Sequence, residues 1–153
     1  MSPSAATARA ALVALVTLGA DQGVKAVVRG SIAPTQEVDV LPGLHLVHVS
    51  NSGVAFSMLS DGGWLPTVIG LAAVAALLAF FFTHLGRPLV WLPTGMLLGG
   101  AAGNLIDRVR IGSVTDFVKL PHWPAFNLAD VAITLGVIAL VYVLEGPRRR
   151  APA

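Results

Sequence analysis

The sequence contains no cysteine and few charged residues. None of the 153 residues is cysteine, which excludes disulfides, thiolate zinc sites, a cysteine nucleophile and lipidation of the chain on cysteine. Charged residues make up 12% of the chain and apolar residues 55%, whereas a soluble domain is about 25% charged. We therefore expect most of the chain to lie in a lipid bilayer.

Several motifs of known enzyme and binding classes are also missing. The net charge is only +2, and no stripe of basic residues alternates with aromatics, so we expect no nucleic-acid partner. The zinc-peptidase pattern HExxH and the serine-hydrolase pattern GxSxG are absent. Of the scattered histidines, His45 and His48 alternate with apolar residues in a strand-like stretch, which favours a structural role. We expect neither a metal nor another cofactor.

Four long apolar stretches are present, and each is close to the length of about 20 residues that crosses a bilayer. They cover residues 8–28, 64–82, 89–106 and 125–144. The sequence thus predicts an all-α integral membrane protein with four transmembrane helices in a single membrane domain, residues 1–153. A packing face of small residues, 99–103, lies within the third stretch.

The two longest connections differ in character. Segment 30–60 carries Pro34, Pro42 and Gly43 and then apolar residues in strand-like alternation, which predicts a small extracytoplasmic β element between the first two helices. It includes Val54, Ala55 and Phe56 as strand-like material. Segment 108–124 is expected to form an outer loop with a short interfacial piece.

Basic residues predict the orientation. Arg9, Arg87 and the cluster 148–150 all fall on one side of the predicted bundle. By the positive-inside rule this side is cytoplasmic, so both termini are expected inside and both long connections outside.

Polar residues gather at the outer ends of the predicted helices. They are Asp21, Lys25, Asn51, Asn104, Asp107, Arg108, Asn127 and Asp130. A charge at the bilayer centre costs on the order of 2.5–3.5 kcal/mol, so such a cluster indicates a functional site near the outer leaflet. The spacing of Asp21 and Lys25 predicts an ion pair within one helix. We expect Asp107 to pair with Arg108 or Arg110.

Two carboxylates are candidates for chemistry. Asp116 follows a turn after the third predicted helix, where it can approach Asp130 at the start of the fourth. Two carboxylates in a partly dry site cannot both ionise cheaply, so one acts as an acid and the other as a base. That pair could activate water against a peptide carbonyl. The structural alternative is that both aspartates only cap a loop and a helix start.

A second function of another class stays open at this point. Asp21, Asp107 and Asp130 could form the proton relay of a small transporter or channel subunit. Such a relay requires polar residues through the full membrane depth, but the inner halves of the second to fourth helices are apolar apart from Thr134. The pattern therefore favours hydrolysis over transport.

Four motifs occur in order along the chain. They are Asp21 and Gln22 with Lys25, then Asn51 to Ser57, then Gly103 to Arg108 followed by Gly112 to Phe117, and finally Phe126 to Asp130. Together they resemble lipoprotein signal peptidase, also called signal peptidase II, an aspartyl intramembrane protease family. Val54 stands where that family commonly has alanine.

The resemblance implies an activity, a substrate and a set of site residues. Asp116 and Asp130 would be the catalytic pair. The substrate would be a bacterial prolipoprotein whose lipobox cysteine already carries diacylglycerol, cleaved just before that cysteine. The supporting residues would be Asn51, Asn104, Arg108, Asn127, Asp21 and Lys25. We expect a monomer in the bacterial cytoplasmic membrane, in contact with membrane lipids, with its active site near the outer leaflet.

Overall fold

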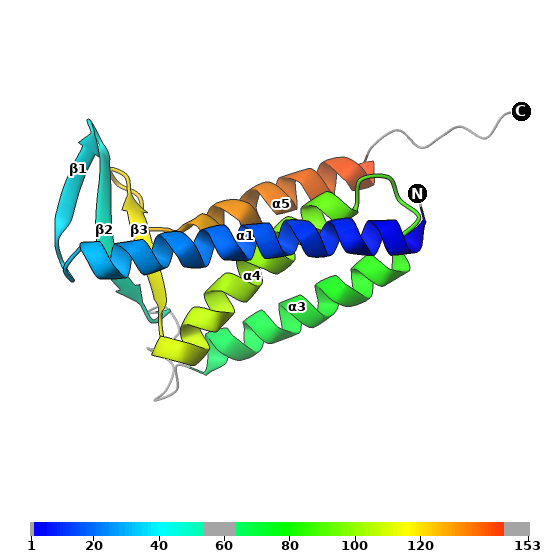
Figure 1. Ribbon diagram of the computed structural model, residues 1–153, viewed down its shortest axis with the longest axis horizontal. Helices are drawn as coiled ribbons and strands as arrows, with labels where there is room; N and C mark the ends of the chain where they lie inside the picture. Colours follow the sequence, from blue (N-terminus) through cyan, green and yellow to red (C-terminus); the bar gives the residue numbers. More distant parts are fainter. Residues whose placement is uncertain (1, 54–63, 146–153) are drawn as a thin grey trace, which may run out of the picture.

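The computed structural model describes residues 2–53 and 64–145. Its elements are α1 (Pro3–Ser31), β1 (Glu37–Leu41), β2 (Leu44–Asn51), α3 (Leu65–Thr83), α4 (Trp91–Ile111), β3 (Val114–Lys119) and α5 (Leu128–Glu145). The long helices lie side by side, and the strands form a small sheet at one end of the bundle (Figure 1). The start of α1 and the end of α5 lie at the opposite end.

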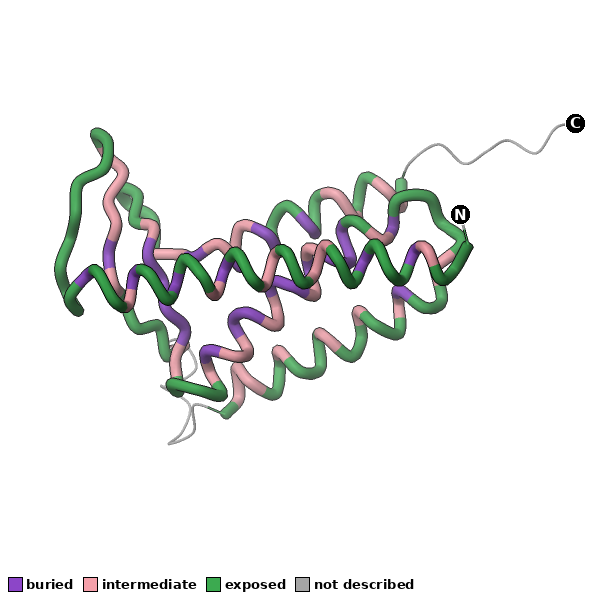
Figure 2. The backbone as a smooth tube through the Cα atoms, in the orientation of Figure 1, coloured by how far each residue is buried: buried purple, intermediate pink, exposed green. Residues whose placement is uncertain are grey.

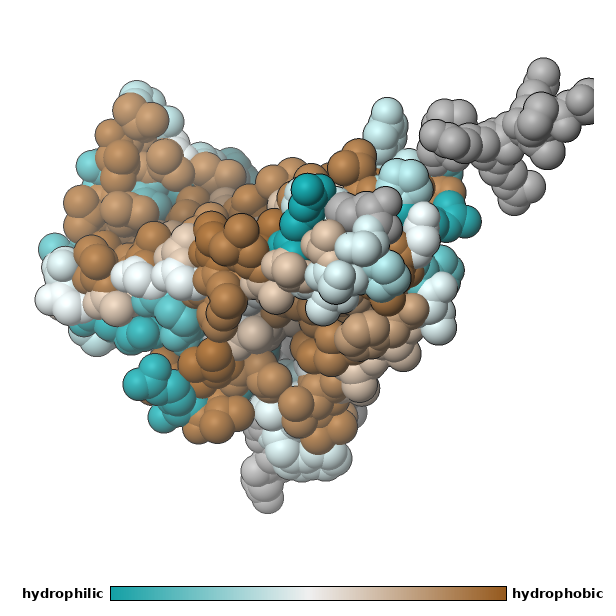
Figure 3. Space-filling view, turned by 45° about the vertical axis from the view of Figure 1, so that its right-hand side comes forward, coloured by the Kyte–Doolittle hydropathy of each residue, from teal (hydrophilic) through white to brown (hydrophobic). Residues whose placement is uncertain are grey.

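Three of the helices, α1, α3 and α5, are long and apolar enough to cross a membrane, as far as the described residues go. Many residues along these helices are exposed (Figure 2). The exposed residues include large apolar ones, for example Leu15 on α1, Val68 on α3 and Ile138 on α5. Apolar side chains also cover much of the helical surface in Figure 3. Contiguous apolar surface of this extent is unfavourable in water and suits contact with lipid.

The remaining long helix, α4, occupies the middle of the bundle. It packs against α1, α3 and α5. It is not among the helices that are apolar enough to be candidate membrane spans. Its sequence carries several glycines together with Asn104, Asp107 and Arg108. Because neighbouring helices cover α4, it can hold polar side chains that a lipid-facing helix could not.

Small residues let the helices approach α4 closely. A Cβ atom added at Gly99 would lie 2.6 Å from the backbone oxygen of Ala14 on α1, and one at Gly100 would lie 2.7 Å from that of Ala129 on α5. Both positions are tighter than a side chain permits, so glycine is required at these contacts. The predicted packing face at residues 99–103 is confirmed.

The sheet has the order β1-β2-β3, with both pairs antiparallel. The hairpin of β1 and β2 confirms the β element predicted between the first two helices. The third strand corrects the sequence analysis, because β3 lies in the segment expected to be an outer loop. In its register Asp116 pairs with Val49, so the strand depends on a partner more than 60 residues away. The residues Val54, Ala55 and Phe56 lie outside the described residues.

The connection from α4 to α5 positions the site. Gly112 ends α4 in the left-handed conformation, with φ of 77°, which glycine adopts without strain. The chain then reverses into β3, and the backbone N–H of Thr115 donates to the Asp107 carboxylate at 3.1 Å. After a turn, Phe126 bridges back to Val118. This return places Asn127, the residue before α5, beside β3.

Candidate active site

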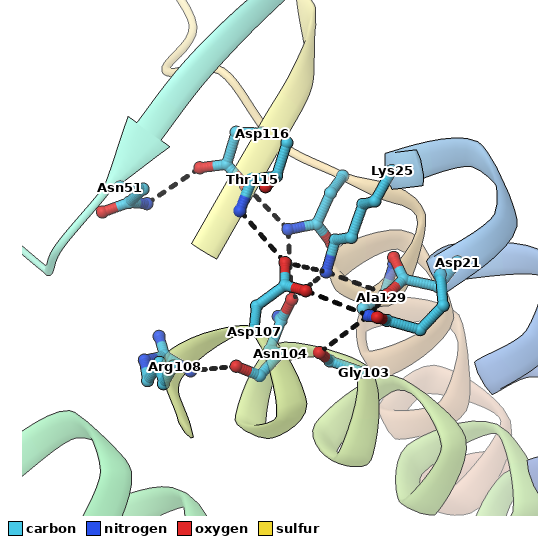
Figure 4. A network of polar contacts seen from close by, with 12 residues as sticks. Asp21, Lys25, Asn51, Gly103, Asn104, Asp107, Arg108, Thr115, Asp116 and Ala129 are labelled. Atoms are coloured by element: carbon cyan, nitrogen blue, oxygen red, sulfur yellow. Dashed lines mark hydrogen bonds and ion pairs between the residues drawn. The ribbon is translucent and has the colours of Figure 1, made fainter. Parts of the chain in front are cut away.

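The polar residues predicted at one end of the helices meet where α1, α4, β2, β3 and the start of α5 converge (Figure 4). Every residue predicted for the site lies in this cluster or at its edge. Asp21, Lys25 and Asn127 have no exposed surface, and Asp116 is 2% exposed. Buried polar groups are costly without partners, so the hydrogen-bond network among them defines the site.

Asn127 joins the two candidate catalytic aspartates. Its side-chain oxygen accepts from the backbone N–H of Asp130 at 3.0 Å, and its own backbone N–H donates to Asp130 Oδ2 at 3.1 Å. This reciprocal pair is a capping box at the start of α5. The side-chain nitrogen of Asn127 donates to Asp116 Oδ1 at 2.7 Å. The capping role considered for Asp130 is therefore real, and it coexists with a link to Asp116.

Asp116 lies on β3 between two amides. Asn51, at the end of β2, donates through Nδ2 to Asp116 Oδ2 at 2.9 Å, opposite the bond from Asn127. Burial raises the pKa of Asp116 above its ordinary value, and the nearby Asp130 charge raises it further. The two amide bonds and the Lys25 charge oppose this rise without cancelling it. Burial thus favours the protonated form of Asp116.

Asp130 is more accessible than Asp116. Asn104 on α4 donates through Nδ2 to Asp130 Oδ1 at 2.9 Å, so both Asp130 oxygens accept an N–H. The side chain is half-buried. It also lines a pocket of about 450 Å³ formed with Trp123, Phe126 and the first turns of α5. A molecule in that pocket would reach this carboxylate directly.

A second pocket approaches from the side of α3. It measures about 470 Å³ and lies between α3 and α4, with Ile133 of α5 contributing. Its walls are mostly apolar, and Asn104 and Arg108 are its polar members. Asn104 and Asp130, which share a hydrogen bond, therefore line different pockets. An extended ligand that crosses this bond would meet an apolar surface on either side.

Lys25 holds the buried ionic part of the site. Its ammonium contacts Asp21 at 2.8 Å, Asp107 at 3.1 Å and Asn104 Oδ1 at 2.9 Å. The predicted pair of Asp21 and Lys25 is confirmed. Asp21 also accepts from the backbone N–H of Ala129 at 2.9 Å, which ties α1 to α5.

The expected partners of Asp107 are wrong. Asp107 contacts Lys25 and Arg29 of α1 rather than Arg108 or Arg110, with 3.6 Å to Arg29. Its side chain faces α1, whereas Arg108 extends toward the pocket beside α3 and donates to the backbone oxygen of Asn104 at 3.4 Å. A residue's position on its own helix does not determine which neighbouring helix supplies the closest opposite charge.

Three further residues belong to the network and were missed as site members. Gln22 donates to the Asp107 carboxylate and to the backbone oxygen of Gly103, both at 3.1 Å. Arg29 donates to the Thr115 hydroxyl at 3.1 Å. Arg29 follows Lys25 by four residues, so helical spacing could have identified it. Thr115 becomes recognisable only once β3 is known.

The arrangement supports proton-transfer chemistry. No group of three or more metal-ligating side chains forms within residues 2–53 and 64–145. The site pairs a buried carboxyl, Asp116, whose pKa is raised by burial, with a more accessible carboxylate, Asp130, and Asn127 links the two. Such a pair can act as general acid and general base in hydrolysis. Fold and site together define a helical membrane protein whose two carboxylates could catalyse hydrolysis.

Comparison with known proteins identifies the family of the chain. It belongs to the signal peptidase (SPase) II family, whose model matches residues 13–144, and it is a protease of that family. It is 42% identical to a lipoprotein signal peptidase of Moorella thermoacetica, covering 89% of this chain and 92% of the relative. It is also 42% identical to one of Pseudomonas fluorescens, covering 84% and 82%.

The fold has solved counterparts. A bacterial membrane enzyme determined at 1.9 Å superposes with a TM-score of 0.83 and 29% identity, over 91% of this chain and 94% of that one. A second, determined at 2.3 Å, gives a TM-score of 0.80 and 27% identity, over 94% of each chain. The multi-pass architecture is thus shared with enzymes of bacterial membranes.

Proposed function

We propose that this protease cleaves the signal peptide from bacterial prolipoproteins whose lipobox cysteine carries diacylglycerol, just before that cysteine. Family membership and the curated relatives named lipoprotein signal peptidase support the substrate class. The observation that carries the chemistry is the link through Asn127, whose backbone and side chain contact both Asp116 and Asp130. These two aspartates are the proposed catalytic residues.

The proposed roles follow from the surroundings of each aspartate. Asp130 is the more accessible carboxylate and lines a pocket, so it takes the proton of the attacking water. Asp116 favours its protonated form and donates to the carbonyl oxygen as the water oxygen bonds to carbon. The roles then reverse. Asp130 protonates the leaving nitrogen, the C–N bond breaks, and Asp116 regains its proton from the hydroxyl.

The surrounding residues suit a substrate that is apolar on both sides of the scissile bond. A prolipoprotein has the apolar run of its signal peptide on one side and acyl chains on the other. The two mostly apolar pockets are lined by the two partners of one hydrogen bond, Asn104 in one pocket and Asp130 in the other. Asn51 donates to Asp116, and Arg108 lines the pocket beside α3. We assign both residues to positioning the substrate backbone. Asn104 and Asn127 support the aspartates, while Asp21 and Lys25 brace the site.

We also propose the arrangement in the membrane. The chain acts as one membrane domain, residues 1–153, and α4 is the fourth span because it runs within the bundle beside the other three. The start of α1, which carries Arg9, and the connection from α3 to α4, which carries Arg87, lie at the end of the bundle opposite the sheet (Figure 1). This supports cytoplasmic termini and a site near the outer leaflet of the bacterial cytoplasmic membrane. The protein works as a monomer among membrane lipids and binds no nucleic acid.

A reporter fusion tests this arrangement. A reporter that is active only outside the cytoplasm, fused to the C-terminus, should give no signal, because an even number of spans returns the chain to the side on which it started. The same reporter inserted after Leu41, in the turn between β1 and β2, should be active. A strong signal from a stable C-terminal fusion would overturn the proposed topology.

The catalytic proposal is tested with isosteric variants and a lipidated prolipoprotein peptide. Asp116→Asn and Asp130→Asn should each abolish cleavage, because asparagine keeps the volume but cannot cycle a proton. The double variant should be no more impaired than either single, since the two carboxylates act as one unit. Asp39→Asn is the matched control, because Asp39 is an exposed carboxylate on β1. It should retain cleavage.

The same preparations distinguish failure of chemistry from failure of folding. Each variant is purified in lipid or detergent, and its thermal unfolding is compared with that of the wild type. Substantial turnover by a folded Asp116→Asn or Asp130→Asn protein would refute the two-aspartate mechanism.

A further inference from the structure

Lys25 has a hydrogen-bond arrangement that a simple ion pair does not require. The side chain is fully buried, and an ammonium carries three protons and no acceptor. Its three partners are the carboxylates of Asp21 and Asp107 and the amide oxygen of Asn104. Two protons therefore serve ion pairs, and the third goes to a neutral amide that also contacts Asp130.

This third proton determines how the Asn104 amide is oriented. Because an ammonium can only donate, the atom of Asn104 that faces it must be the oxygen. The nitrogen then points the other way, toward Asp130 Oδ1 at 2.9 Å. Asn127 also donates to the Asn104 oxygen, at 3.1 Å, but the bond from Lys25 is shorter and charge-assisted, and such bonds are the stronger kind. An inverted amide would place its oxygen against the Asp130 carboxylate.

The surrounding charges show that Lys25 is neutralised locally. The ion pairs around Lys25 join Asp21, Lys25 and Arg29 of α1 with Asp107 of α4. These four formal charges cancel. Beyond them, Asp116 on β3 and Asp130 on α5 face the same amides, and Arg108 of α4 donates to the Asn104 backbone oxygen. The main route from Lys25 to Asp130 is therefore the oriented amide rather than a free positive charge.

We propose that Lys25 is a positioning residue for the reaction: through Asn104 it keeps an N–H donor on Asp130 and so maintains Asp130 as the ionised base. The inference deepens the proposed function and rests on it. It assigns Lys25 a task beyond bracing α1 against α4. Without the ammonium, the Asn104 amide can invert, Asp130 loses a donor, and its charged form becomes less favourable.

The test must remove the ammonium without leaving a buried, uncompensated carboxylate. The variant is therefore Lys25→Met combined with Asp21→Asn, and its reference is Asp21→Asn alone. Asp107 keeps Arg29, Gln22 and the Thr115 N–H in both proteins. A second pair, Lys25→Met with Asp107→Asn against Asp107→Asn alone, provides the same comparison if the first pair does not fold. In this pair Asp21 keeps Gln22 and the Ala129 N–H as its donors.

The readout is the pH profile of kcat/KM for cleavage of a lipidated prolipoprotein peptide. The acid limb is the low-pH side of this profile, where activity falls as the base is protonated. Loss of the hydrogen bond from Asn104 to Asp130 should move the acid limb upward by about one pH unit or more relative to the reference. In an Asn104→Leu background, removing Lys25 should move the limb no further, because the amide through which Lys25 acts is gone.

A merely structural Lys25 gives a different result. Its removal would lower the unfolding temperature and the amount of active enzyme, but the acid limb would stay at its reference position. Superimposable limbs would overturn the proposal. So would an upward shift that persists fully in the Asn104→Leu background, because it would show action through space. A folded wild-type protein that does not cleave the peptide would instead overturn the proposed function.

Discussion

Replacing Asn127 should separate helix capping from catalysis at a single position. The side chain does two things: its oxygen caps α5 by accepting from the Asp130 N–H at 3.0 Å, and its nitrogen donates to Asp116 at 2.7 Å. Asn127→Ser retains a capping oxygen but is too short to reach Asp116. Asn127→Ala loses both contacts. Comparing the two variants therefore isolates the bridging bond.

The expected magnitudes follow from these contacts. Losing an N-cap costs about 1 kcal/mol of stability, so Asn127→Ala should unfold at a lower temperature than Asn127→Ser. A hydrogen bond involving a charged group contributes about 1.5–3 kcal/mol. If the bond to Asp116 is made in full in the transition state, its loss slows cleavage roughly tenfold to a hundredfold in both variants.

The assay pairs thermal unfolding with single-turnover cleavage of a lipidated peptide on the same preparations. Wild-type turnover by Asn127→Ser would show that the bridge to Asp116 contributes nothing to the reaction. Equal loss of stability in the serine and alanine variants would show that residue 127 is not an effective cap. Either result would refute the reasoning built on this residue.

Three further predictions follow from the geometry. Because burial raises the pKa of Asp116, this carboxyl favours folding below its ordinary pKa of 3.8 and loses that contribution as pH rises. The unfolding temperature of Asp116→Asn, which cannot ionise, should therefore rise relative to that of the wild type as pH increases above that value. A difference between the two unfolding temperatures that does not change with pH would contradict the raised pKa. Gly99→Ala should destabilise the protein by roughly 1–3 kcal/mol, since its Cβ would meet Ala14, whereas Gly23→Ala, with open space around it, should stabilise α1 by about 0.5–1 kcal/mol. Denaturant or thermal unfolding measures the stability of both variants, and equal changes in the two would contradict close packing at Gly99. Asn51→Ala removes one donor from Asp116 without opening the bundle. Turnover should therefore fall while the unfolding temperature stays unchanged. Unchanged turnover would show that Asn51 has only a structural role.

Much of this architecture could be predicted from the sequence because the relevant signals are local. Apolar runs of about 20 residues identify membrane-spanning helices without knowledge of their neighbours. The i, i+4 spacing of Asp21 and Lys25 was enough to predict their ion pair, now seen at 2.8 Å. The ordered motifs around Asp116 and Asp130 indicated the family, which the comparisons confirm.

Other features depend on partners that are distant in sequence. β3 was expected to be loop because its six residues form a strand only by pairing with β2, and strand pairing of this kind has no local periodic signal of useful length. Asp107 was assigned to the arginines of its own helix, whereas helix packing brings it to Lys25 and Arg29.

The sequence by itself determined which charged and polar residues lie at the ends of the long apolar helices. Only the tertiary structure decided the atoms that meet. Residue spacing fixes positions along one helix, but hydrogen bonds require distances near 3 Å between groups on several elements. The bridge of Asn127 between Asp116 and Asp130, and the orientation of Asn104 by Lys25, arise because α1, α4, β3 and α5 converge at one point.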